Sequence, residues 1–71
     1  MPKFDPQLVL VMRSALEEVM TKVPLEYSTP TTKVFLAEYI LEAAARGQTG
    51  YDQFVAVASA HIQEIIKLLF S

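Results

Sequence analysis

Two prolines, each directly after a residue that caps helices, constrain how this chain folds. Asp5 precedes Pro6, and Thr29 precedes Pro30. A short polar side chain at the cap accepts a hydrogen bond from a free backbone amide, and proline suits the first helical position because it lacks that amide. We therefore expect helices to begin at these two points and Pro24 to end the first helix.

A third helix is predicted after a glycine-containing turn. Gly47 follows the second apolar segment, where a left-handed residue commonly ends a helix. Thr49, with Asp52 three residues later, resembles a capping box at the start of the next helix. The expected fold is all-α: a single domain over 1–71, with three antiparallel helices at roughly 5–23, 30–46 and 50–70.

Apolar residues in each segment recur with helical spacing, so each helix is expected to have one core face. In the first helix this face comprises Leu8, Val9, Met12, Ala15, Leu16, Val19, Met20 and Val23. In the second it comprises Val34, Leu36, Ala37, Ile40, Leu41, Ala43, Ala44 and Ala45. In the third it comprises Phe54, Val55, Val57, Ala58, His61, Ile62, Ile65, Ile66, Leu68 and Leu69, an arc wider than the roughly 100° stripe that one packing surface needs.

This excess of apolar surface predicts association with a second copy. A chain of 71 residues buries only about 60% of its unfolded surface, no cysteine is available for a disulfide, and 52% of the residues are hydrophobic. Phe35 and Tyr39 add apolar area on the otherwise polar side of the second helix; packing against the first helix is the alternative for this pair. The predicted homodimer interface comprises Phe35, Tyr39, His61, Ile62, Ile65, Ile66, Leu69 and Phe70.

Charge and hydropathy argue against several other partners. The net charge is −2 and the six basic residues are scattered, whereas nucleic-acid binding needs clustered Lys and Arg. No stretch reaches the roughly 18 uninterrupted apolar residues of a membrane span, so none is expected. The start of the chain lacks the long apolar core of a secretory signal, so a cytoplasmic location is expected.

Few residues suggest chemistry. His61 is the only histidine, and an ordinary packed imidazole is favoured over a ligand contact or a pH sensor. Glu38 and Glu42 lie four residues apart and are interpreted as part of a solvated face. No nucleophile–base pair, metal-ligand set or phosphate loop is visible, so no enzyme activity, cofactor, or catalytic or metal residue is predicted.

The sequence thus favours a small self-associating interaction module with an adaptor or regulatory role. An unidentified second protein is a further partner to consider. The alternative function is binding of an apolar small molecule or lipid between the helices, next to His61.

Two short motifs carry a resemblance. Phe4, Asp5 and Pro6 form an N-terminal "FDP", and Ile40, Leu41, Ala43, Ala44, Ala45 and Gly47 form an "IL-x-AAA-x-G" stretch. With these motifs the chain resembles small uncharacterised helical proteins of alphaproteobacteria, up to about Phe54. The hydrophobic segment 62–70 departs from that pattern. The resemblance implies a bacterial cytoplasmic protein and assigns no functional residue.

Overall fold

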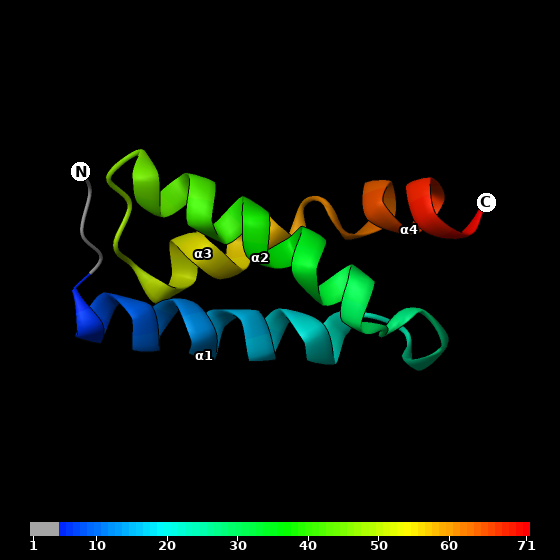
Figure 1. The fold of residues 1–71 in the computed structure, drawn as a ribbon, viewed down its shortest axis with the longest axis horizontal. Coiled ribbons are helices and arrows are strands. Elements are labelled where there is room, and N and C mark those ends of the chain that lie inside the picture. Colours follow the sequence, from blue (N-terminus) through cyan, green and yellow to red (C-terminus); the bar gives the residue numbers. More distant parts are fainter. Residues whose placement is uncertain (1–4) are drawn as a thin grey trace.

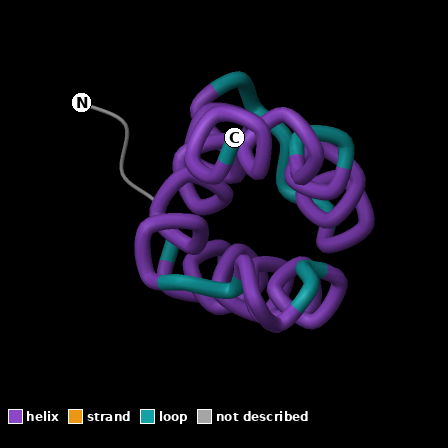
Figure 2. The backbone as a smooth tube through the Cα atoms, turned by 90° about the vertical axis from the view of Figure 1, so that its right-hand side faces the viewer, coloured by secondary structure: helices purple, strands orange, loops and turns teal. Residues whose placement is uncertain are grey.

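The computed structural model describes residues 5–71, and these residues form helices without any strand. The helices are α1 (Pro6–Lys22), α2 (Pro30–Ala45), α3 (Tyr51–Ser59) and α4 (Ile62–Phe70), with a short 3-10 turn at Leu25–Tyr27 (Figure 1). Seen end-on, nearly all of the backbone is helical and the connections are short (Figure 2). The all-α class predicted from the sequence is confirmed.

Both predicted cap-and-proline starts are present. The Asp5 carboxylate accepts a hydrogen bond from the Gln7 amide at 2.8 Å, and the Thr29 hydroxyl accepts one from the Thr32 amide at 3.2 Å. Gly47, after the end of α2, has a φ of 101°, the left-handed geometry that favours glycine. Local backbone chemistry therefore sets the bounds of α1 and α2.

The start of α3 differs from the predicted capping box. The helix begins at Tyr51, so Gly50 rather than Thr49 is the cap residue. The side-chain oxygen of Gln53 accepts a hydrogen bond from the Gly50 amide at 3.1 Å, which satisfies a free amide without the predicted role of Asp52.

The prediction of one unbroken helix over 50–70 is wrong, because a turn at Ala60 and His61 separates α3 from α4. The His61 amide bonds to the Ala58 carbonyl at 3.0 Å, which is the tighter 3-10 pattern. The His61 carbonyl then accepts the Ile65 amide at 3.0 Å and starts α4. Ser59 and His61 are both weak helix formers, so packing can override helix continuity at this point.

The turn redirects the chain between two packing environments. α3 lies against both α1 and α2, whereas α4 packs on α2. α1 and α2 run in opposite directions, and α4 extends the molecule past α3, at the end opposite the α2–α3 turn (Figure 1). The result is elongated, with extents of 36 × 20 × 18 Å.

One apolar cluster holds the four helices together. Phe54 on α3 is the largest fully buried side chain, and Leu36, Ile40 and Val19 are fully buried as well. Thr32 is the one buried polar residue among those described, and its hydroxyl lies 3.1 Å from that of Thr29. The full core comprises Met12, Ala15, Val19, Val23, Leu36, Ile40, Ala43, Ala44, Phe54, Ala58, Ile62 and Ile65.

Several residues assigned to the core faces are instead exposed. The helical wheel gives the direction of an apolar face but not how much of it a neighbouring helix covers. Val34 is 57% exposed and Leu68 is 68% exposed. The remaining exposed members of the predicted faces are Val9, Leu41 and Ala45.

Replacing Phe54 with alanine should unfold most of the protein. The ring is fully buried, and deleting a buried phenylalanine costs about 3–5 kcal/mol, which is comparable to the whole stability of so small a domain. Urea titration followed by far-UV circular dichroism measures the effect. The matched control is Leu25→Ala, since Leu25 is 91% exposed and the change should stay within about 0.5 kcal/mol. Equal stability of Phe54→Ala and wild type would contradict this packing.

Candidate functional site

Two of the predicted interface residues lie in the core of the single chain. Ile62 is 9% exposed and Ile65 only 1% exposed, so neither offers surface to a second molecule. Both residues lie on α4, which packs on α2, so their side chains are covered within the chain. Among the other predicted residues, Phe70 is exposed, and Phe35, Tyr39, His61, Ile66 and Leu69 are half-buried.

Phe35 and Tyr39 lie next to α4. Together with Ile65, Leu68 and two charged residues of α4, they line a shallow hollow between α2 and α4. Packing on α1, one of the two alternatives for this pair, stays a prediction. We call this surface the α2/α4 face; it comprises Phe35, Tyr39, Glu64, Ile65, Lys67 and Leu68.

Three polar side chains join α4 to α2 at the edge of the α2/α4 face. The Tyr39 hydroxyl donates a hydrogen bond to Glu64 Oε1 at 2.9 Å, and His61 Nδ1 lies 3.2 Å from the same oxygen. The rings of Tyr39 and His61 stack, with centroids 3.9 Å apart and planes 5° from parallel. Sequence reasoning selected Tyr39 and His61 but missed Glu64, whose partner lies 25 residues away in the chain.

The charges in this cluster are arranged to keep Glu64 ionised. The hydrogen bond from Tyr39 is the largest cause that lowers the pKa of Glu64, followed by the one from His61. The same bond raises the pKa of Tyr39, because it holds the phenol proton against a carboxylate. Glu64 also lies in the first turn of α4, where the helix dipole favours negative charge.

These contacts give the cluster a bracing role. Each of the three side chains directs a polar atom or its ring at another member, so the cluster links the start of α4 to α2. The ring of Phe70 lies 4.9 Å from that of Tyr27 at the far end of α4. α4 is thus attached at both ends by aromatic side chains.

Carboxylates surround the α2/α4 face. Glu38 and Glu42 line a hollow beside Phe35 and Tyr39, and Glu64 lies on the α4 side. Arg46 pairs with Glu42 at 3.3 Å, and Lys67 lines the face itself. A partner for this face would have to present apolar groups together with positive charge.

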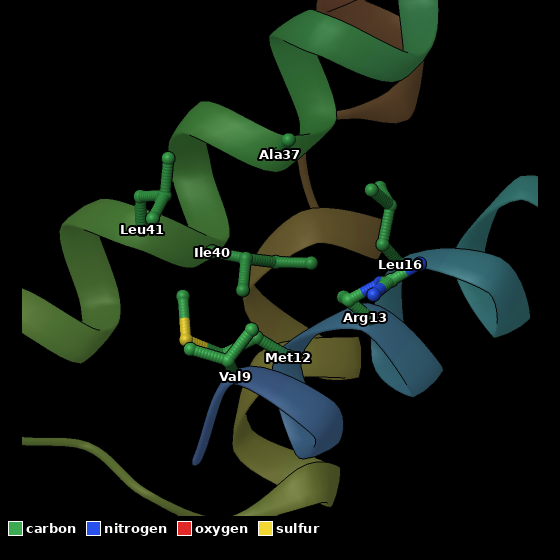
Figure 3. Close-up of a pocket in the computed structure, with 7 residues that line it drawn as sticks. All are labelled: Val9, Met12, Arg13, Leu16, Ala37, Ile40 and Leu41. Atoms are coloured by element: carbon green, nitrogen blue, oxygen red, sulfur yellow. The ribbon is translucent and has the colours of Figure 1, made fainter. Parts of the chain in front are cut away.

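A second apolar surface lies between α1 and α2, and sequence reasoning missed it. We call it the α1/α2 groove; it has a volume of about 180 Å³, and Figure 3 shows α1 and α2 on its two sides with α3 behind it. Its lining residues are Val9, Met12, Arg13, Leu16, Ala37, Ile40 and Leu41 (Figure 3).

The register of α1 and α2 places one cation at the rim of this groove. Lys33 Nζ lies 3.0 Å from Glu17 Oε2, so these two residues lie side by side on the two helices. Four residues from this pair on each helix, Arg13 and Ala37 share the same position along the helix axes. Another four residues on, Val9 and Leu41 share a position at the other end of the groove. Arg13 is the one charged residue that lines the groove.

Neither surface has the features of a metal centre. Within residues 5–71, no three His, Asp or Glu side chains come together in a way that could hold a metal ion. The segment Tyr51–Phe70 is long and apolar enough to cross a membrane by length and composition alone, which is weak evidence because core helices pass the same test. The absence of a membrane span stays a prediction.

Comparisons with known proteins add no family. No protein-family model matches the chain. No curated protein and no solved structure matches it either. The resemblance to alphaproteobacterial proteins stays a prediction from the motifs alone.

Glu64→Gln should reduce stability at neutral pH and have less effect in acid. Because folding lowers the pKa of Glu64, its contribution is fully present above the ordinary carboxyl pKa and is lost as the pH falls through the folded pKa. Thermal melting of both proteins between neutral and acidic pH measures the difference. The two melting curves should converge in acid.

Tyr39→Phe is the companion variant, since it removes the hydroxyl that donates to Glu64 but keeps the ring that stacks on His61. Like Glu64→Gln, it should lower the melting temperature at neutral pH and have less effect in acid. Glu26→Gln is the control, because Glu26 is exposed in the 3-10 turn away from the cluster. A stability gap that stays constant down to acidic pH would contradict the role of the Glu64 carboxylate.

Proposed function

We propose that this protein is a small self-associating interaction module with an adaptor or regulatory role. The observation that carries the proposal is the number of large apolar side chains left on the surface of one small chain. Contiguous apolar surface of a few hundred Å² usually marks an interaction site. The exposed large apolar residues are Val9, Leu10, Leu25, Val34, Leu41, Tyr51, Leu68 and Phe70.

These residues are not scattered evenly. Val9 and Leu41 line the α1/α2 groove, and Val34 lies one turn from Ala37 along the same edge of α2. Leu68 belongs to the α2/α4 face on the other side of α2. Both surfaces therefore use α2, and pairing with a second copy would complete an antiparallel helical bundle around it.

The size of the α1/α2 groove favours a protein partner over a small molecule. Pockets for drug-sized ligands usually enclose about 300–1,000 Å³ and bury most of the ligand, whereas this groove of about 180 Å³ is open along its length. Such a groove accommodates side chains from another helix. The alternative, binding of an apolar small molecule or lipid next to His61, falls on the α2/α4 face instead, where a hollow of about 450 Å³ is lined by Tyr39 and Glu64, the two side chains that contact His61.

Analytical ultracentrifugation over a dilution series tests self-association. We expect a dimer at micromolar concentration that dissociates on dilution, and a melting temperature that rises with protein concentration, because only the folded protomer binds its partner. A species of 7.9 kDa at every concentration, with a melting temperature independent of concentration, would overturn the proposal.

A further inference from the structure

We infer that the second copy docks on the α1/α2 groove, with α1 of each protomer lying over α2 of its partner, and that Arg13 pairs with the partner's Glu38. This inference rests on the proposed self-association and specifies the face, the occupant and the charge contact.

The apolar part of the interface is already in place. Met12 and Ile40 form the buried floor of the groove, and Val9 and Leu41 are its exposed edges, at 37% and 45%. α3 contacts both helices of the α1/α2 pair and lies behind the groove (Figure 3). Ala37, between these edges, lets another helix approach closely.

The charged part of the interface is self-complementary. Arg13 lines the groove on the α1 side, and Glu38 directly follows Ala37 on α2. Neither forms an ion pair with another described residue, whereas the neighbouring Glu17 and Lys33 pair with each other. Glu38 does not line the groove itself; it stands on the adjoining flank of α2, between the groove and the α2/α4 face. Among the described residues, Arg13 and Glu38 therefore lie at the same level along the helices without an ionic partner.

A two-fold axis along the groove brings these charges together. Rotation by 180° about such an axis does not move a residue along the helices, but it exchanges the two sides of the groove. α1 therefore lies over the partner's α2, and these two helices run in opposite directions, as α1 and α2 do within one chain. Arg13 is level with Ala37, so it meets the partner's Glu38, and the same contact forms a second time by symmetry. Two ion pairs then flank an apolar centre.

Self-pairing through the α2/α4 face is less favourable. Glu38, Glu42 and Glu64 border that face, and Lys67 is the one basic residue that lines it. Two copies of that face would bring carboxylates together, and like charges across an interface oppose association.

A charge exchange tests the inference. Arg13→Glu and Glu38→Arg should each raise the dimer dissociation constant about tenfold, since each replaces two symmetric attractions with repulsions. The double variant restores both attractions with the signs reversed and should return the constant to within about threefold of wild type. Lys67→Glu, on the α2/α4 face, is the control and should leave the constant unchanged.

The outcomes separate this inference from the proposed function. A wild-type protein that stays monomeric overturns the proposed function and this inference with it. A wild-type dimer that neither single variant weakens, or that the double variant fails to restore, overturns the α1/α2 face alone and leaves self-association standing.

Cross-linking gives an independent readout, because the chain contains no cysteine. Arg13→Cys and Glu38→Cys are prepared separately, mixed, and treated with a short bismaleimide. The mixture should yield covalent dimers well above the level of either variant alone, since only the mixed dimer brings residue 13 of one protomer to residue 38 of the other. Equal yields from the mixture and from the separate variants would overturn the inference.

Discussion

The burial of Phe54 between α1 and α2 is the contact on which the other features depend. α3 is only nine residues long and would be a marginal helix in water, so its order comes from this packing. With α3 on one side of the α1/α2 pair, the opposite side of that pair is left as an open apolar groove. The chain turns at Ala60–His61, after α3, and α4 then packs on α2.

α2 is the element that all other helices share. It contacts α1, α3 and α4, and both apolar surfaces of the molecule border it. The two surfaces differ in charge: Arg13 lines the α1/α2 groove, while carboxylates border the α2/α4 face. One helix thus separates an apolar groove lined by a cation from an apolar face bordered by carboxylates.

Signals that act over a few residues could be read from the sequence, and signals that depend on tertiary contacts could not. Asp5, Thr29 and Gly47 act through adjacent backbone groups, so the bounds of α1 and α2 were predictable. The break before α4 has no proline or glycine to announce it. Phe35 and Tyr39 could be recognised as a second apolar feature, but the α1/α2 groove could not, because a helical wheel does not show which part of an apolar face a neighbour leaves uncovered.

The attachment of α4 has a consequence for the order in which the protein opens. α4 has nine residues and packs mainly on α2, so it lacks the second supporting helix that α3 has. Its release would break the contacts of Tyr39 with Glu64 and of Phe70 with Tyr27 and would expose Ile62 and Ile65, whereas the packing of α3 on α1 does not involve α4. Detachment of α4 therefore costs less free energy than global unfolding, and it transiently uncovers the side of α2 that Ile65 covers in the closed state.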